Sequence, residues 1–157
     1  MFAALEEATE YIRKNDIRFI DLKFTNLFGG LHHITIPAHQ FNDQLMQEGV
    51  GFDSSSTPGF KALEAGDMVL IPDLKTAFMD PFHEYPTLSF LCNIAEADTK
   101  RRFHRDPRYI AALAEEYLLS TGIATESRWG PEFEYYIFDS VDYRNDPFYS
   151  YFKINSN

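Results

Sequence analysis

The sequence is poor in cysteine, in positive charge and in long hydrophobic runs. Its single cysteine, Cys92, cannot form a disulfide within the chain, and it lies in an apolar run that is typical of core packing. Fourteen Lys and Arg residues against 24 Asp and Glu give a formal net charge of −10, so we expect no nucleic-acid partner and no membrane partner. No basic leader and no apolar stretch of membrane-spanning length occurs, which makes the cytoplasm the expected location.

Aromatic residues, by contrast, are abundant. The 157 residues include 15 Phe and 9 Tyr, and 45% of the chain is hydrophobic, which is enough to furnish a buried core. The chain has no Walker-type phosphate loop, because no Lys and Ser/Thr pair follows Gly29-Gly30 at the required spacing. These features predict a globular protein.

Hydrophobic periodicity predicts both helices and strands. Apolar residues recur at helical spacing in some segments and alternate in others, and Gly29-Gly30 is expected to turn one strand into the next as a hairpin. The expected helices are 5–12, 38–47 and 107–121, and the expected strands are 18–25, 31–37, 68–72, 76–80, 87–94 and 149–154. Residues 48–60 are rich in Gly and Ser, so we expect a loop there, of the kind that often carries function.

A polar run divides the chain into two parts. Residues 96–102 are expected to be a linker, and we interpret the basic run 100–102 with Arg105 as solvated charge rather than a phosphate-binding patch. Asp106 is the expected N-cap of the next helix, with Pro107 at its first position. Only one or two strands are expected after that helix, and the sequence contains no further elements that could cover their faces or pair with their edges. We therefore expect the C-terminal third to begin a larger domain, which makes the chain an N-terminal fragment.

Two carboxylates lie two residues apart in the aromatic run 129–139. In a strand, side chains repeat their direction every second residue, so Glu132 and Glu134 are expected to project from one face. Neighbouring carboxylates either share a proton or hold a cation, and Mg²⁺ and Mn²⁺ prefer oxygen ligands of this kind. The same spacing also occurs on the solvated face of a surface strand. The pattern is thus compatible with half of a metal site and with ordinary surface charge.

The histidines do not have the spacing of a zinc site. His32 and His33 point to opposite faces of a strand, and we interpret them as edge-strand residues. His39, His83 and His104 are isolated in the sequence, and we expect them to be turn or surface groups.

Four segments, in order, resemble the N-terminal part of bacterial type I glutamine synthetases. They are residues 18–25 with 34–38, residues 52–56, residues 67–73 leading to 80–82, and residues 106–108 with 130–134. The resemblance implies an α+β fold with an N-terminal β-grasp domain over residues 1–98. The truncated start of the catalytic α/β domain is then expected over residues 103–157. It also implies a homo-oligomer, a dodecamer when full length, whose active sites lie between neighbouring subunits.

The resemblance also implies a ligase of glutamine biosynthesis. In that reaction the side-chain carboxylate of glutamate attacks the γ-phosphate of ATP, and ammonia then displaces phosphate. Two divalent metals, Mg²⁺ or Mn²⁺, are implied, with Glu134 near the glutamate and Glu132 on the metal that bridges the nucleotide phosphates. Asp53 would bind ammonium and help to deprotonate it, and Ser56 would support it. The other metal ligands and most of the ATP pocket would follow Asn157, so we expect the 157-residue chain alone to be inactive.

Two positions depart from the family's usual pattern. Ser54 stands where the family has Gly, and Phe133 replaces the Pro between the two glutamates. Because Gly permits backbone angles that Ser resists, the loop after Asp53 could differ in shape, and a glutamate–amine (γ-glutamyl) ligase of the same family stays open. A stand-alone, non-catalytic β-grasp interaction module is a further alternative. Retention of Asp53, Glu132 and Glu134 favours the ligase.

Overall fold

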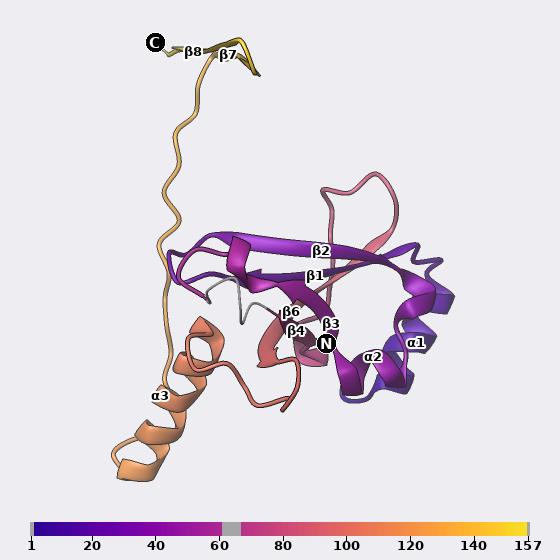
Figure 1. Cartoon of the computed structure of the whole chain (residues 1–157). Coiled ribbons are helices and arrows are strands. Elements are labelled where there is room, and N and C mark those ends of the chain that lie inside the picture. The colour runs from indigo at the N-terminus through magenta and orange to yellow at the C-terminus, as the bar shows by residue number, and fades with distance from the viewer. Residues whose placement is uncertain (1, 61–66, 157) are drawn as a thin grey trace. The chain divides into compact units, whose positions relative to one another are not determined.

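The computed structural model of the chain describes residues 2–60 and 67–156, so Met1 and Asn157, the outer ends of the two expected domains, lie outside the described residues. The chain divides into two compact units between Glu126 and Ser127. Figure 1 shows the elements of both. No helix among the described residues is long and apolar enough to cross a bilayer.

The first unit is built on a mixed sheet with the strand order β2-β1-β6-β4-β3, and β5 pairs with β6 (Figure 1). The strands are β1 (Phe19–Thr25), β2 (Leu31–Pro37), β3 (Val50–Asp53), β4 (Asp67–Pro72), β5 (Phe78–Met79) and β6 (Thr87–Glu96). β1 and β2 form the predicted antiparallel hairpin, in which Gly29 adopts a φ of 82° that suits glycine. β1 runs parallel to the distant β6.

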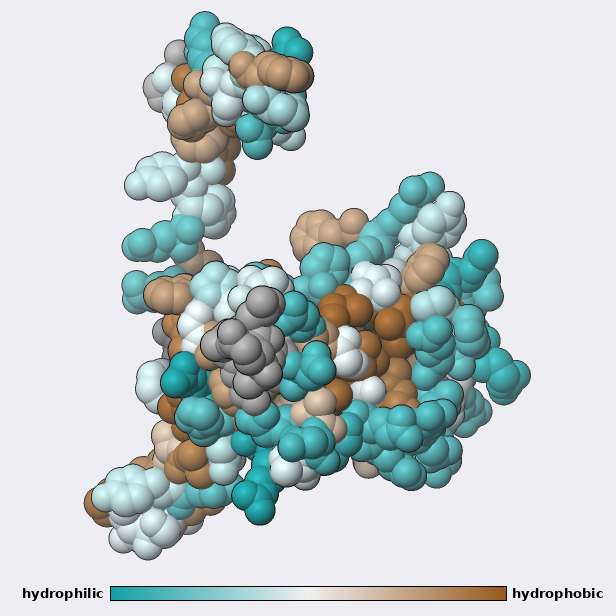
Figure 2. Space-filling view, in the orientation of Figure 1, coloured by the Kyte–Doolittle hydropathy of each residue, from teal (hydrophilic) through white to brown (hydrophobic). Residues whose placement is uncertain are grey.

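The helices begin and end largely where the sequence predicted. α1 spans Leu5–Lys14, and α3 spans Pro107–Thr121 with Asp106 as its N-cap. The single helix expected over 38–47 is wrong. A 3-10 turn, η1 (Ala38–Gln40), is separated from α2 (Asp43–Glu48) by two residues, the second of which, Asn42, caps α2. In Figure 1, α3 lies apart from α1 and α2. Hydrophilic side chains dominate the surface around α1 and α2 in Figure 2.

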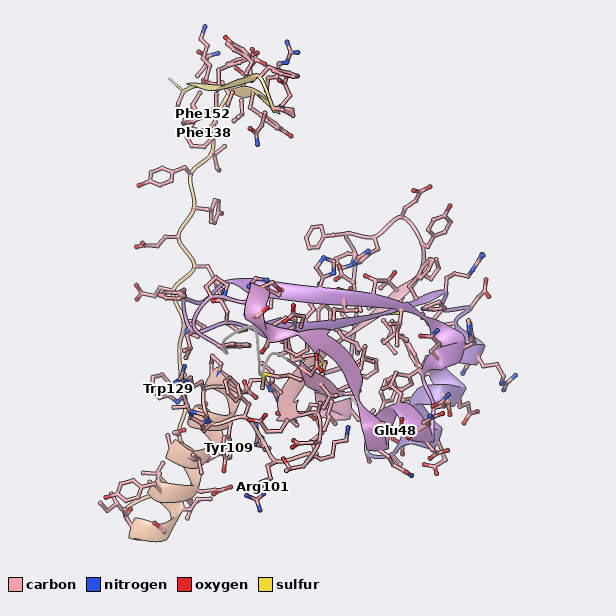
Figure 3. The ribbon with its side chains drawn as sticks, viewed as in Figure 1. Glu48, Arg101, Tyr109, Trp129, Phe138 and Phe152 are labelled. Atoms are coloured by element: carbon pink, nitrogen blue, oxygen red, sulfur yellow. The ribbon has the colours of Figure 1, made fainter. Side chains whose placement is uncertain are left out.

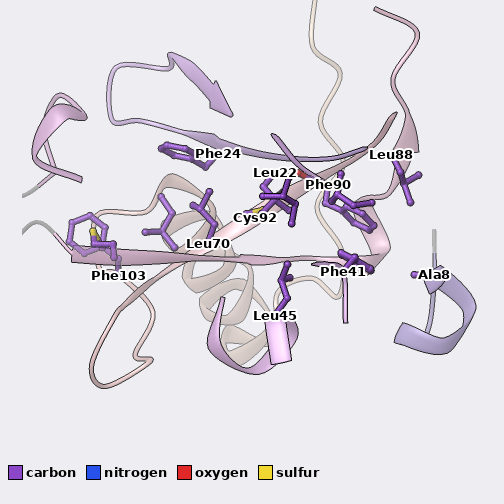
Figure 4. Close-up of a cluster of buried hydrophobic side chains, with 14 of the residues drawn as sticks. Ala8, Leu22, Phe24, Phe41, Leu45, Leu70, Leu88, Phe90, Cys92 and Phe103 are labelled. Atoms are coloured by element: carbon purple, nitrogen blue, oxygen red, sulfur yellow. Dashed lines mark hydrogen bonds between the residues drawn. The ribbon is translucent and has the colours of Figure 1, made fainter. Parts of the chain in front are cut away.

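The core consists of side chains from the sheet packed against the helices and the connecting segments (Figure 4). Phe90 on β6 is fully buried and stacks on Phe41, with 4.9 Å between ring centroids. Burial of such a side chain contributes about 2–3 kcal/mol. Cys92 is also fully buried, which confirms the core-packing prediction, and burial raises the pKa of its thiol. A catalytic role for this cysteine is therefore disfavoured.

Residues 48–60 contain regular structure, so the prediction of a loop throughout this segment is wrong. β3 pairs antiparallel with β4 at the edge of the sheet, and a 3-10 turn, η2 (Ser54–Ser56), follows. The strand expected over 76–80 is shorter than predicted, because η4 (Leu74–Thr76) takes its start and β5 has only two residues. Local composition could not reveal these pairings, since they depend on which sheet edge is available.

The polar run expected to be a linker folds back onto β6. Ala95 and Arg102 form an isolated β-bridge. The buried Asp106 carboxylate accepts a hydrogen bond from the Ile94 backbone N–H at 3.0 Å, and desolvation raises the pKa of Asp106. The start of α3 is thus fastened to the sheet. The domain boundaries at residues 98 and 103 stay a prediction.

The second unit contains an antiparallel hairpin of β7 (Ser140–Asp146) and β8 (Tyr149–Asn155), which confirms the strand expected over 149–154. The strand expected over 129–139 is wrong. The segment between Trp129 and Phe138, both labelled in Figure 3, has no regular secondary structure. A strand needs a neighbour for its backbone N–H and C=O groups, and within the described part of the chain none forms a ladder with this segment.

Candidate active-site residues

Asp53 ends β3 and opens the 53–60 loop, which we call the Asp53 loop. Its side chain is exposed, and its Oδ1 accepts a hydrogen bond from the Ser55 N–H at 2.8 Å. Hydrogen bonds from the side chain and backbone of Ser55 lower the pKa of Asp53. The carboxylate is therefore ionised near neutral pH, held in one orientation and open to a cation from solution.

The two serines on either side of Ser55 have different environments. The Ser56 hydroxyl is exposed and donates to the backbone carbonyl oxygen of Asp53 at 3.0 Å, so it helps to shape the turn. Ser54 is fully buried, and its Oγ has no hydrogen-bond partner among the described residues. Ser54 does not adopt a positive φ, so this loop conformation does not require the glycine that the family usually has there.

Glu132 and Glu134 lie in the irregular segment that precedes β7. Both are exposed, and within the described ranges no Lys or Arg pairs with either carboxylate. Exposed, uncompensated carboxylates fit the oxygen chemistry of a hard divalent cation. Two such ligands do not fill the coordination shell of Mg²⁺ or Mn²⁺. Asp53 belongs to the first unit and the two glutamates to the second, and all three assignments stay predictions.

A buried ionic cluster in the sheet was not predicted from the sequence. Asp21 on β1 and Asp80, which follows β5, are both buried, and the Lys23 ammonium lies 3.1 Å from Oδ2 of Asp21 and 2.9 Å from Oδ2 of Asp80. Thr35 and His33 bond the other oxygen of Asp21, at 2.6 and 2.7 Å. Asp21 and Lys23 share a strand face by their spacing, but nothing local indicates that Asp80 joins them.

The cluster contains side chains that could hold a metal ion, but the Lys23 ammonium occupies the position of the cation. Oxygens of Asp21 and Asp80 and a ring nitrogen of His83 lie within 4.8 Å of one another. The Lys23 ammonium already neutralises the same oxygens. It lowers the pKa of Asp80 to about 2, and hydrogen bonds outweigh burial to lower the pKa of Asp21. His83 lies in the turn region between β5 and β6, which agrees with the prediction of a turn group, but the sequence did not indicate that its Nε2 lies 3.6 Å from Oδ2 of Asp80.

Known proteins with similar sequences contain the same kind of domain as this sheet. The family model described as "Glutamine synthetase, beta-Grasp domain" matches residues 16–97. The chain is 46% identical over 152 residues to a glutamine synthetase of Azotobacter vinelandii, which covers 97% of this chain and 32% of the relative. It is also 40% identical over 156 residues to a 3-hydroxylaminophenol mutase of Cupriavidus pinatubonensis, which covers 99% of this chain and 33% of that one.

Among solved structures, a Plasmodium falciparum glutamine synthetase superposes with a TM-score of 0.77 at 23% identity, over 99% of this chain and 30% of that chain. The sheet and its helices are thus a β-grasp domain in an α+β protein, as the sequence predicted. The chain belongs to the glutamine synthetase family. It spans about a third of the length of the curated relatives it matches.

Proposed function

We propose that the chain is the N-terminal part of a glutamine synthetase, which joins ammonia to glutamate through γ-glutamyl phosphate at the expense of ATP. The observation that carries the proposal is the presence of Asp53, Glu132 and Glu134 as exposed acids within a chain 46% identical to a glutamine synthetase. A pure interaction module has no need of acidic residues at these places. The name of the mutase relative shows that similarity alone does not fix the reaction.

In this proposal the two glutamates supply oxygen ligands to divalent cations. Glu134 would hold the metal beside glutamate, and Glu132 the metal beside the nucleotide phosphates. Such cations neutralise oxygen charge during phosphoryl transfer. The absence of lysine or arginine partners in the described part of the chain leaves both carboxylates available. The remaining ligands would come from further residues of the full-length protein.

Asp53 would receive the nitrogen donor. Its carboxylate, ionised and fixed by Ser55, attracts ammonium and accepts a proton from it, which frees the nitrogen lone pair for attack. Ser56 would act through the turn, since its hydroxyl bonds the Asp53 backbone. We place the full-length protein in the cytoplasm as a homo-oligomer, a dodecamer, whose partners are glutamate, ammonium and ATP rather than nucleic acid or membrane.

The first test is a ligase assay of the full-length protein and of the 157-residue chain. We expect ATP- and ammonium-dependent glutamine formation by the full-length protein with Mg²⁺ or Mn²⁺, and none by the chain alone, which has too few ligands. A panel of nitrogen donors separates the alternatives. Preference for an alkylamine over ammonium would establish the γ-glutamyl amine ligase. The observation that favours this alternative is Ser54, which stands next to Asp53 where the family usually has Gly. No ligation with any donor would favour the interaction module.

Complementation between subunits tests the shared site. If Asp53 serves the neighbouring subunit, Asp53→Asn and Glu134→Gln proteins are each inactive. In mixed oligomers formed from equal amounts, about a quarter of the sites carry both native residues. We expect a corresponding recovery of activity after co-refolding, measured as glutamine formed per subunit. No recovery in oligomers shown by mass spectrometry to be mixed would place both residues in the same subunit's site.

A further inference from the structure

We propose that Arg105 is a positioning residue for the Asp53 loop, and that the loop stays in shape because the segment before α3 holds its C-terminal end. The proposal rests on the proposed function of Asp53 and adds a residue that determines how the nitrogen donor is bound. Arg105 lies outside β3 and outside the Asp53 loop itself. Its effect would therefore be transmitted through the loop backbone rather than by contact with a substrate.

The contact is made at the end of the Asp53 loop. Nη1 of Arg105 donates to the backbone carbonyl oxygen of Phe60 at 3.1 Å and to that of Gly59 at 3.4 Å. Beside this contact, the buried Phe60 ring packs edge-on against the fully buried Phe103 ring, with 5.2 Å between centroids and 70° between planes. Arg105 thus binds the backbone of Gly59 and Phe60, and the aromatic pair additionally fixes the side chain of Phe60.

The opposite side of this point is held by the β1–β2 hairpin. Gly59 has a φ of +85°, and a Cβ at this position would lie 3.0 Å from Cδ1 of Leu27. The chain can pass here only because residue 59 has no side chain and tolerates a positive φ. Gly59 is itself exposed, but its Cα lies against the Leu27 side chain and its carbonyl oxygen accepts from Arg105.

Hydrogen bonds connect this fixed end to Asp53. The Phe60 N–H donates to the Thr57 carbonyl at 3.2 Å, and the Thr57 N–H donates to the Ser54 carbonyl at 3.0 Å. Ser54 and Thr57 are both buried, so the middle of the loop is also anchored. The last step is the Ser55 N–H, which donates to the Asp53 carboxylate. Release of the loop at Phe60 removes the support on which the orientation of this carboxylate depends.

Arg105 is exposed, as the sequence-based interpretation of solvated charge expected, but the sequence did not reveal that its guanidinium also binds the carbonyls of Gly59 and Phe60. Arg105 immediately precedes Asp106, the buried N-cap that fastens α3 to β6 through Ile94. The same turn thus fixes the start of α3 and the end of the Asp53 loop. A proposed ammonium site on β3 is in this way linked to the helix that follows the sheet.

The test is Arg105→Gln in the full-length protein, with Arg101→Gln as the control because Arg101 is exposed and the change in charge is the same. We expect backbone amides of residues 54–60 to exchange with deuterium several-fold faster in Arg105→Gln. We expect KM for ammonium to rise roughly threefold to tenfold, while kcat and the KM values for glutamate and ATP stay within about twofold. Arg105→Lys should recover part of the loss, since an ammonium also donates to carbonyls.

Gly59→Ala perturbs the same point without touching Arg105, and it should give the same selective rise in KM for ammonium. Unchanged exchange in Arg105→Gln, or equal losses for all three substrates, would overturn the proposal. Exchange is measured without substrates, so it reports on the loop even if the full-length protein makes no glutamine. If the full-length protein makes no glutamine, that result overturns the proposed ligase function and leaves the exchange test of the loop intact.

Discussion

Replacement of Glu134 by Gln in the full-length protein is expected to lower kcat/KM for glutamine formation by about 100-fold or more, because a metal ligand contributes several kcal/mol of charge stabilisation in phosphoryl transfer. The amide keeps the size of the side chain and removes its negative charge. We expect the Mg²⁺ or Mn²⁺ concentration for half-maximal activity to rise in parallel. Steady-state assays over a metal titration measure both effects, and Glu132→Gln should behave similarly.

Two variants serve as controls for this prediction. Glu10→Gln removes the same charge from the exposed surface of α1 and should leave activity unchanged. Phe133→Pro restores the residue that the family usually has between the glutamates, and it should retain activity because the exposed segment has no strand ladder to disturb. Near-native activity of Glu134→Gln at all metal concentrations would assign this side chain to the solvated surface.

Replacement of Lys23 by Met is expected to lower the free energy of unfolding by about 3 kcal/mol, because it leaves two buried carboxylates without their cation. The Lys23 ammonium is the common partner of Asp21 and Asp80, and its own side chain is only 16% exposed. Met fills a similar volume, so the loss is electrostatic rather than a packing defect. Urea denaturation of the full-length protein measures this loss of stability. The control is Lys75→Met, because the Lys75 side chain is exposed.

The pH dependence of the same variant separates ion pairing from packing. The pKa of Asp80 is about 2 in the folded state, below the usual value of 3.8, so its stabilising contribution is complete above about pH 4 and is lost as the pH falls toward 2. Without Lys23 this pKa rises, and the difference between native and variant should shrink over that range. The raised pKa of Asp106 acts in the opposite direction in both proteins and cancels in the comparison. A difference that is constant from pH 6 to 2.5 would indicate packing.

The elements that were predicted correctly carry their signals locally. Gly29-Gly30 gave the hairpin, because only a residue that tolerates positive φ permits this turn. Asp106 and Gly122 gave both ends of α3, since the N-cap side chain and the left-handed C-cap are single-residue properties. Asp53 could also be proposed from the sequence, because residues 52–56 are one of the four segments that together carry the resemblance.

The helix expected over 38–47 is broken locally, by the Asn42 cap of α2. Most of the other differences share one cause, which is that the outcome depends on a partner far away in the sequence. The alternation around Glu132 fits a strand, but no ladder forms with it in the described part of the chain. The sequence placed His83 in a turn and Arg105 among solvated charges, and it did not reveal that His83 lies 3.8 Å from Asp21 or that Arg105 binds the carbonyls of Phe60 and Gly59. Residues separated by tens of positions meet only after the sheet has formed.

The sequence by itself determined that this is an α+β chain of the glutamine synthetase family, with its β hairpin, its capped helix and its acidic candidates for chemistry. These follow from backbone conformations and spacings that neighbouring residues decide. Only the tertiary structure decided that β3 becomes an edge strand, that Lys23 neutralises two carboxylates, and that Arg105 holds the Asp53 loop. Burial and pairing depend on contacts between strands far apart in the chain, and local sequence carries little information about them.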